Sequence, residues 1–140
     1  MSLFTHQTIH LTTHGRKTYL MTDKVKQVVE QSGIQTGMCH LFLQHTSASI
    51  ILCENADPDV QTDLETYMTG LVKDGDHRFK HIDEGVDDMS AHIRSVLTKN
   101  DLSIPIISGK LMLGIWQGIF LWEHRTHHQN RQLIVMINGE

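Results

Sequence analysis

The sequence predicts an α+β fold: a single compact domain over residues 1–140 with a mainly antiparallel β-sheet and about three helices. First, strand-like segments follow one another in pairs, which is typical of hairpin neighbours and therefore of antiparallel sheets. Second, three segments with apolar residues at helical spacing interrupt these strands. Third, no repeat, low-complexity segment or linker divides the 140 residues, a length that can bury a core without disulfides. The predicted order is β-β-α-β-β-α-loop-α-β-β-β.

The chain begins with two predicted strands. Residues 3–12 alternate in polarity along the segment, and we expect the face that carries Leu3, Ile9 and Leu11 to be the core face. A turn separates this strand from a short second strand at residues 16–21. The opposite face of the first strand carries histidines that we expect to face solvent or an interface, namely His6, His10 and His14.

The first helix is predicted to begin at Thr22 or Asp23 and to end at Ser32, just before Gly33. A threonine or aspartate at the N-cap accepts hydrogen bonds from the free N–H groups of the first turn. A glycine after the last turn readily adopts the left-handed conformation that ends many helices. The inner face of this helix is expected to consist of Val25, Val28 and Val29.

Two apolar strands are predicted next, at residues 38–46 and 47–54. Alternation places His45 at the end of the core face of the first one. From the residues alone, a histidine there is more often a hydrogen-bonded residue at the edge of the core than a ligand. Cys39 and Cys53 lie inside these apolar runs, and we expect both thiols to be buried and unpaired.

The second helix is predicted to begin after Asp57, with Pro58 at its first position, because both residue types are typical of helix starts. Asp59 and Asp63 lie one turn apart on a common face. Carboxylates in a first turn normally interact with the helix dipole, but these two could also hold a metal-bound phosphate if the helix pointed at a pocket. The residues expected to be buried are Val60, Leu64, Tyr67, Met68 and Leu71.

The stretch from His81 to His92 concentrates acidic residues and allows two interpretations. Gly85 interrupts it, so a loop is predicted first, followed by a third helix capped by Asp87 or Asp88. Imidazoles and carboxylates that converge from different segments bind zinc and other divalent ions. The spacing matches no metal motif, however, so the residues by themselves favour a solvated loop before an ordinary helix. The inner face of that helix is expected to consist of Met89, Ile93 and Val96.

The last third of the chain is predicted to consist of strands. Residues 102–108 form an extended run in which Pro105 indicates a sheet edge. Gly118, inside the next strand, indicates a bulge or a close backbone approach. The final strand, residues 131–137, is apolar on both faces and is therefore expected to be central in its sheet.

One face of residues 115–127 changes character along its length. It is apolar in the middle and ends in Glu123, Arg125 and His127. A strand shows this pattern when it leaves the core for a pocket or, more commonly, for solvent.

The overall composition excludes some classes of partner. A net charge of −4 and a pI near 6.2 argue against sequence-independent nucleic-acid binding, which needs a basic surface. No apolar run approaches membrane-spanning length, and no signal-like segment opens the chain. We therefore expect a cytoplasmic protein without nucleic-acid or membrane partners. The unusual feature is the histidine content, eleven residues.

Four blocks of the sequence together resemble the YjbQ-like family, whose members are labelled secondary thiamine-phosphate synthases. The blocks are H-T-S-A-S, E-N-x-D-P-x-V, G-x-D-D-M-x-x-H and W-Q-G-I, and the resemblance runs in order over nearly the whole chain. It implies a compact α+β fold, usually a trimer, with a histidine-rich pocket for a divalent metal and an oxyanion. Two positions depart from the family pattern: Ile115 replaces a hydroxyl residue, and Ser90 stands in place of a proline.

The resemblance also implies roles for individual residues. One set would hold a divalent ion, either zinc or magnesium. A second set would supply carboxylates for catalysis, and a third would bind phosphate, a role that suits guanidinium and imidazole groups. No role is implied for His6, His10, His14 or His128. The three sets are His45, His81 and His92 for the metal; Glu54, Asp59 and Glu123 for catalysis; and Arg125 and His127 for phosphate.

The implied activity is that of a transferase. It would couple a pyrimidine methyl pyrophosphate to a thiazole phosphate and release pyrophosphate, as a main or a secondary activity. The leaving pyrophosphate requires neutralisation by cationic groups or a metal. The same residues would also suit a metal-assisted hydrolase of a phosphorylated small molecule, or a metal- and ligand-binding trimer without catalytic activity. The expected partners are a small phosphorylated substrate and the other copies in a homotrimer.

Overall fold

The computed structural model describes residues 3–140, which form eight strands and three helices in one α+β unit. In chain order these are β1 (Leu3–His14), β2 (Thr18–Leu20), α1 (Thr22–Ser32), β3 (Thr36–Leu43), β4 (Ala48–Glu54), α2 (Pro58–Leu71), α3 (Asp88–Leu97), β5 (Asp101–Ile107), β6 (Lys110–Leu111), β7 (Gln117–Glu123) and β8 (His128–Gly139). The strands pair in the orders β1-β8-β3-β5-β6 and β2-β7-β4, with antiparallel neighbours throughout the described chain. The predicted fold class is confirmed, although the strands form two sheets where one was expected.

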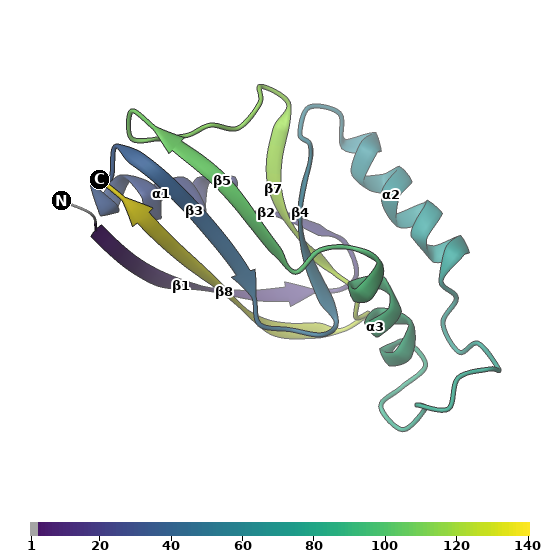
Figure 1. Ribbon diagram of the computed structural model, residues 1–140. Coiled ribbons are helices and arrows are strands. Elements are labelled where there is room, and N and C mark those ends of the chain that lie inside the picture. The colour runs from purple at the N-terminus through teal and green to yellow at the C-terminus, as the bar shows by residue number, and fades with distance from the viewer. Residues whose placement is uncertain (1–2) are drawn as a thin grey trace.

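The main hydrophobic core lies between the two sheets and α1. One face of the five-stranded sheet and one face of the three-stranded sheet contribute to it, and α1 packs at one end (Figure 1). Leu41 on β3, Ile50 on β4 and Val135 on β8 are almost completely buried there. Because strand side chains alternate between faces, every second residue of each strand points into this core. The α1 valines are buried as predicted, namely Val25, Val28 and Val29.

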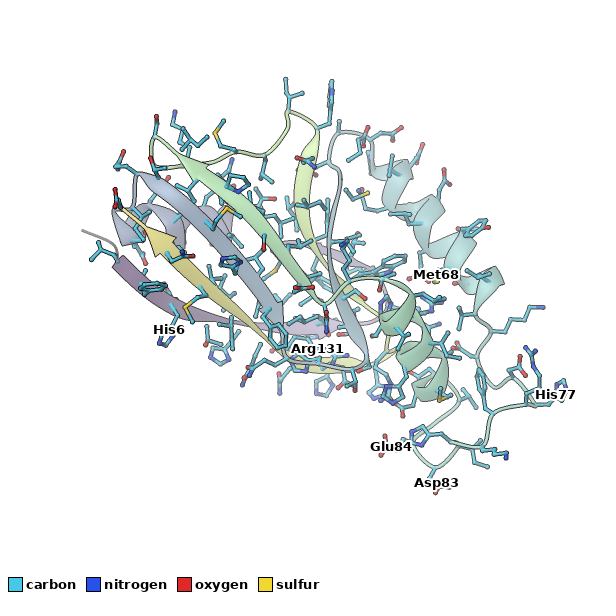
Figure 2. The ribbon with its side chains drawn as sticks, in the orientation of Figure 1. His6, Met68, His77, Asp83, Glu84 and Arg131 are labelled. Atoms are coloured by element: carbon cyan, nitrogen blue, oxygen red, sulfur yellow. The ribbon has the colours of Figure 1, made fainter. Side chains whose placement is uncertain are left out.

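Helices α2 and α3 cover the other face of the three-stranded sheet. In Figure 1 both lie beside β4, away from α1, and Figure 2 labels Met68 on the α2 surface that contacts this layer. A smaller apolar cluster joins the helices to β4 and β7, and Trp122 of β7 is 3% exposed within it. Strand β7 is therefore buried on both faces. Phe120 and Trp122, on the face opposite to Ile119 and Leu121, are apolar as well, so the sequence of this strand agrees with burial on both faces.

Helices α2 and α3 bury fewer apolar side chains than predicted. On α2, Met68 is buried, whereas Tyr67 and Leu71 are 74% and 58% exposed. On α3, Val96 is 84% exposed, while Arg94 is fully buried. Each helix contacts the sheet along a narrow stripe, so an apolar residue beside that stripe remains in solvent. The predicted burial of Tyr67, Leu71 and Val96 is therefore wrong.

The predicted helix ends agree with the structure at some positions only. The Asp57 side chain accepts a hydrogen bond from the first turn of α2 at 2.9 Å, which confirms it as the N-cap. Gly33 ends α1 with φ of 70°, also as predicted. Thr22 and Asp23, by contrast, lie inside α1, and the Thr22 hydroxyl accepts a bond from a β7 backbone N–H. Asp87 precedes α3 without a capping bond, because other groups bind its carboxylate.

Three further predictions concern strand residues. Strand β8 lies between β1 and β3, so the final apolar strand is internal as expected. Gly118 pairs regularly with Cys53, and a Cβ at Gly118 would come within 2.9 Å of the Asn55 Cβ. A close approach and not a bulge thus explains the glycine. Both thiols are unpaired, but Cys39 is buried and Cys53 only half-buried.

Apolar surface remains exposed on the outer face of the five-stranded sheet. Within residues 3–140 no helix covers this face, on which Phe42 is 49% and Met136 38% exposed. Figure 2 shows His6 at its margin on β1, pointing away from the core. None of the helices in the described part of the chain is long and apolar enough to cross a membrane.

Candidate metal centre at the start of helix α3

Asp88, the first residue of α3, lies where two histidines converge. Its Oδ2 is 2.7 Å from His81 Nε2 and 3.1 Å from His92 Nε2. His81 comes from the loop between α2 and α3, whereas His92 follows Asp88 by one helical turn and so lies on the same face. Among residues 3–140, these three form the one cluster of potential metal-binding side chains whose ligand atoms all lie within 4.8 Å of one another.

Hydrogen bonding defines the tautomer of His92. Its Nδ1 lies 2.9 Å from the backbone oxygen of Thr46, and because a carbonyl can only accept, Nδ1 carries a proton. The Nε2 atom that faces Asp88 then either carries a second proton or offers its lone pair to a cation. Metal-ligating histidines typically donate their other ring N–H to such a carbonyl. The surroundings of His92 are therefore those of a metal-ligating imidazole.

Arg125 holds the other oxygen of Asp88. Its Nη1 donates to Asp88 Oδ1 at 2.8 Å and its Nε donates to Asp87 Oδ2 at 3.1 Å. Its Nη2 donates to the backbone oxygen of Glu84 at 3.0 Å. The guanidinium thus fastens the start of α3 to the loop before it. The phosphate-binding role implied for Arg125 is difficult to combine with these contacts, because they occupy most of its donors.

Both carboxylates at the start of α3 are stabilised in the ionised form. Burial raises the pKa of Asp87, but hydrogen bonds from Arg125 and Thr126 outweigh it and lower the pKa to about 2. Burial likewise raises the pKa of Asp88, but the hydrogen bond from His81 and the charges of His92 and Arg125 lower the pKa overall. An ionised carboxylate between two imidazoles is suited to share a divalent cation with them.

A second set of contacts fixes the loop that carries His81. Arg16 Nη1 donates to Asp74 Oδ2 at 2.9 Å, at the end of the loop nearer α2. The Gly75 N–H donates to the Val86 oxygen at 2.9 Å and closes the loop across its base. The loop lies at the end of the molecule beyond α3, where Figure 2 labels His77, Asp83 and Glu84. His81 is thus presented by a loop whose two ends are fastened.

The structure does not bring His45 into the cluster around Asp88. The Nε2 of His45 accepts a hydrogen bond from the Gln132 backbone N–H at 2.7 Å, so in the neutral ring the proton is on Nδ1. Burial lowers the pKa of His45 and the charge of Arg131 lowers it further, while Glu123 acts in the opposite direction. His45 and His92 do line one cavity of about 440 Å³. His45 therefore faces the same space as His92, with its Nε2 already engaged.

Glu123 is fully buried and bonded to several groups. Its carboxylate accepts hydrogen bonds from Thr13 Oγ1 at 2.7 Å, from Arg131 Nε at 2.7 Å and from the Arg125 backbone N–H at 3.0 Å. These contacts join the ends of β1, β7 and β8, near Arg131 in Figure 2. Glu123 is therefore placed as a structural anchor and has no access to a ligand.

The remaining residues implied by the resemblance lie apart from Asp88. Strand β4 starts opposite Glu123 and ends at Glu54, so the two ends are about 20 Å apart at the usual rise per residue. Glu54 accepts hydrogen bonds from two backbone N–H groups before α2, and Asp59 is exposed in the first turn of α2. His127 is exposed in the turn after β7, two residues beyond Arg125.

Asp88 is absent from the metal-ligand set that the resemblance implied, although the sequence contains a signal for it. Asp88 and His92 are four residues apart in a predicted helix, a spacing that places them on one face. The contacts of Arg125 with Asp87 join residues 38 positions apart, so no local pattern in the sequence indicates them.

The donor set around Asp88 fits a divalent cation. Two imidazole nitrogens and a carboxylate oxygen are the ligand types that zinc binds. Three protein ligands leave room for a further ligand, as in catalytic sites. Two cavities adjoin the histidines of the cluster, one lined in part by His81 and the other by His92.

Comparison with known proteins places the chain among YjbQ-like relatives. A family model described as UPF0047 protein YjbQ-like matches residues 7–140. The UPF0047 protein sll1880 of Synechocystis sp. is 50% identical over 130 residues, which cover 93% of this chain and 88% of that protein. The UPF0047 protein YjbQ of Escherichia coli O157:H7 is 39% identical, with 96% and 97% covered.

Solved structures show the same fold. The crystal structure of a YbjQ-like protein of unknown function from Sulfolobus solfataricus P2 matches with a TM-score of 0.90 and 29% identity, over 100% of both chains. An uncharacterized YjbQ/UPF0047 protein from Clostridium acetobutylicum matches with a TM-score of 0.82 and 34% identity, covering 92% of this chain and 98% of that one.

Proposed function

The chain belongs to the YjbQ-like UPF0047 family, and we propose that it binds a divalent metal ion through His81, Asp88 and His92. We further propose that the site takes a small phosphorylated substrate and works as a transferase of the thiamine-phosphate synthase type. It would join a pyrimidine methyl pyrophosphate to a thiazole phosphate and release pyrophosphate. Relative to the set implied by the resemblance, Asp88 takes the place of His45.

The observation that carries the metal proposal is the direction of the two imidazole rings. His81 Nε2 and His92 Nε2 lie 2.7 and 3.1 Å from the same Asp88 oxygen. In the absence of a cation, both nitrogens need a proton to bond that oxygen, and His92 must then be an imidazolium because its Nδ1 already donates. A divalent ion satisfies all three groups with His92 neutral. Two imidazoles favour zinc over magnesium, which prefers oxygen ligands and water.

The proposed chemistry divides between the ion and the chain. A bound divalent ion would neutralise the charge that develops on the leaving pyrophosphate. Arg125 positions Asp88 and keeps it ionised. His45 can donate its Nδ1 proton to a phosphoryl oxygen in the cavity beside His92, whose described lining contains hydroxyl, amide and imidazole groups and no carboxylate. A ring-nitrogen nucleophile requires no covalent enzyme intermediate, so no serine or cysteine nucleophile is needed.

Of the other residues implied by the resemblance, one remains a candidate for the site and three do not. His127 stays a candidate for phosphate binding, because it is exposed and close in sequence to Arg125. Glu54 and Asp59 lie toward the opposite end of β4, and Glu123 is enclosed by its hydrogen-bond partners. These three carboxylates therefore have no part in the proposed reaction.

Product analysis tests the reaction. Zinc-loaded protein is incubated with the pyrimidine methyl pyrophosphate and the thiazole phosphate, together and separately. Thiamine phosphate and pyrophosphate formed only from the pair support the transferase. Phosphate released from one substrate alone indicates a hydrolase and contradicts the proposal. No turnover, with a ligand-induced rise in melting temperature, indicates a binding protein. His92→Ala must abolish any turnover, which excludes a contaminating enzyme.

A further inference from the structure

Nearly half of the eleven histidines of the chain lie on the outer face of the five-stranded sheet. Strand side chains alternate between the two faces of a sheet, and these histidines alternate with residues of the main core. Figure 2 shows one of them, His6, pointing away from the core. The proposed metal centre uses none of them. All five are exposed on β1, β3 and β8, namely His6, His10, His14, His40 and His128.

Strand register brings histidines from different strands into one row. His6 on β1 and His40 on β3 both pair with Met136 on β8, so the three side chains follow one another across the sheet. The Nδ1 of His40 lies 2.9 Å from the hydroxyl oxygen of Ser103 on β5, which continues the row. The imidazoles are therefore distributed over the face and are not confined to one edge.

The same face carries few fixed charges. The chain has 12 basic and 16 acidic residues, but within residues 3–140 none of them points outward from β1, β3 or β8. The outward charged side chains of this sheet are Asp101 on β5 and Lys110 on β6. The cores of protein interfaces are likewise depleted of charged residues. With neutral imidazoles, two copies of this face meet without like-charge repulsion.

Apolar side chains and sufficient area complete the features of an interface. Phe4 is 77%, Phe42 49% and Met136 38% exposed on this face. Strands β1, β8, β3 and β5 have 12, 12, 8 and 7 residues. At the usual rise and spacing of strands they form a face of roughly 600 Å² in plan. A stable interface typically buries about 800 Å² of each partner, so the face is large enough to hold another copy of the chain.

Protonation of the histidines changes this face from nearly neutral to positive. Histidine is the side chain that gains its charge between about pH 8 and pH 5. His14 pairs directly with His128, and like charges in such a pair are unfavourable. Asp101 is the one outward carboxylate on the described strands of this sheet, so most of the added charge has no partner. Because unpaired charges are costly to bury, contact with another copy becomes less favourable as the pH falls.

We infer that this face is an interface between copies of the chain and that its five histidines make the contact sensitive to pH. The contact forms while the imidazoles are neutral and opens as the pH falls toward about 5.5. The inference is independent of the proposed function, because the five histidines lie outside the metal centre.

Light scattering of the full chain at micromolar concentration and low ionic strength tests this at about pH 8 and about pH 5.5. The mass should be a multiple of 16.0 kDa at the higher pH and approach 16.0 kDa at the lower one. Association should weaken by about tenfold or more between them. His6→Gln/His40→Gln, which cannot gain charge beside Met136, should stay associated at the lower pH. His77→Gln, whose native side chain is 95% exposed on another loop, should dissociate like the wild type.

A charge-mimicking variant tests the same contact without acidification. His6→Lys/His40→Lys carries the added charge permanently and should have the mass of one chain already at about pH 8. Its zinc content should equal that of the wild type, which separates this inference from the metal centre. Circular dichroism at each pH shows whether a change in mass reflects unfolding, and if it does, the lysine variant at the higher pH decides.

Four results would overturn the inference. A mass of one chain at both pH values excludes the contact between copies. An unchanged multiple at both values excludes control by the histidines. Equal dissociation of the wild type and His6→Gln/His40→Gln places the pH dependence elsewhere in the molecule. Association of His6→Lys/His40→Lys at the higher pH shows that copies meet through another surface.

Discussion

Asp88 has more contacts within the candidate site than either histidine. One of its oxygens faces His81 and His92, and the other accepts from Arg125, while the side chain is 3% exposed. A buried carboxylate is unfavourable unless it is paired and hydrogen-bonded. The contacts that stabilise Asp88 also orient the two imidazoles. We therefore expect the stability of the α3 start and the geometry of the site to depend on the same residues.

Asp87 supports this arrangement through Arg125 and Thr126, and Asp87→Asn should destabilise the protein by about 2 kcal/mol at neutral pH. The pKa of Asp87 falls from 3.8 to about 2 on folding, so folding stabilises its ionised form. That contribution is complete above about pH 4 and is lost as the pH falls toward 2. Urea unfolding of both proteins at pH 7 and at about pH 2 measures it.

The two unfolding free energies should converge at the lower pH. Asp83→Asn, in the same loop but exposed, is the matched control and should stay within about 0.5 kcal/mol of the wild type. A constant difference between wild type and Asp87→Asn at both pH values would contradict the assigned role.

A second prediction about the pH dependence of stability concerns His124. It is fully buried, its Nε2 lies 2.7 Å from Ser49 Oγ, and its Nδ1 has no partner within residues 3–140. Burial, followed by the charges of Arg94, Arg16 and Arg131, lowers its pKa to about 3. Between that value and the ordinary 6.5, the unfolded chain binds more protons than the folded one. Stability should therefore rise with pH across this window and be lost as the pH falls.

The variant His124→Gln isolates this contribution because glutamine does not titrate. Its unfolding free energy, measured with urea between about pH 4 and pH 6, should change less steeply with pH than that of the wild type. Parallel curves for the two proteins would show that His124 is not held in its neutral form.

The sequence predicts the site residues best where they are close along the chain. His81 and His92 flank the acidic stretch, and the four-residue spacing of Asp88 and His92 in one helix indicates that both lie on the same helix face. His45 was expected at the end of a strand, but β3 ends at Leu43 and the half-buried His45 follows it. Its bond to the Gln132 N–H depends on how β8 pairs with β3. Such contacts between distant segments follow from strand register, which the local pattern does not determine.

At the scale of elements, all three helices and the long strands were predictable, and their partners were not. Periodicity shows which residues are apolar, but not how much of a helix face the sheet will cover. The apolar run of β7 agrees with its burial between the main core and the layer of α2 and α3, but it does not identify these partners. The division of the strands into two sheets likewise depends on pairing between segments that are far apart in sequence.

Because α2 contacts the sheet along a narrow stripe, substitutions on and beside that stripe should differ in their effect on stability. Met68→Ala should destabilise the protein by about 2 kcal/mol or more, because a buried side chain leaves a cavity. Leu71→Ala removes a similar volume at a position that is 58% exposed and should cost less than about 1 kcal/mol. Thermal unfolding of the two variants gives the comparison. Equal losses would mean that Leu71 is covered in solution.

At the scale of the whole molecule, we propose that the chain assembles as a homotrimer through the outer face of the five-stranded sheet. Phe42, Ile107 and Met136 leave apolar area on this face, and exposed patches of this kind are typical of interfaces. Light scattering at micromolar concentration should give about three times the 16.0 kDa chain mass.

Substitutions on that face should separate the copies. Phe42→Lys with Met136→Lys should reduce the mass to that of one chain, because buried unpaired charges oppose association. Tyr67→Lys, at an exposed position on α2, is the control and should keep the trimer. A monomeric wild type would contradict the proposed assembly.

His81, Asp88 and His92 are proposed to hold one divalent ion, and the zinc content of purified variants measures whether they do. After equilibration with zinc and removal of the excess, elemental analysis should find one zinc per chain in the wild type, and in His45→Ala and in His77→Ala, whose native side chain is 95% exposed. His81→Ala, Asp88→Asn and His92→Ala should each lose most of the metal while circular dichroism shows the fold retained. Full zinc occupancy in Asp88→Asn or His92→Ala would show that these side chains do not bind the ion.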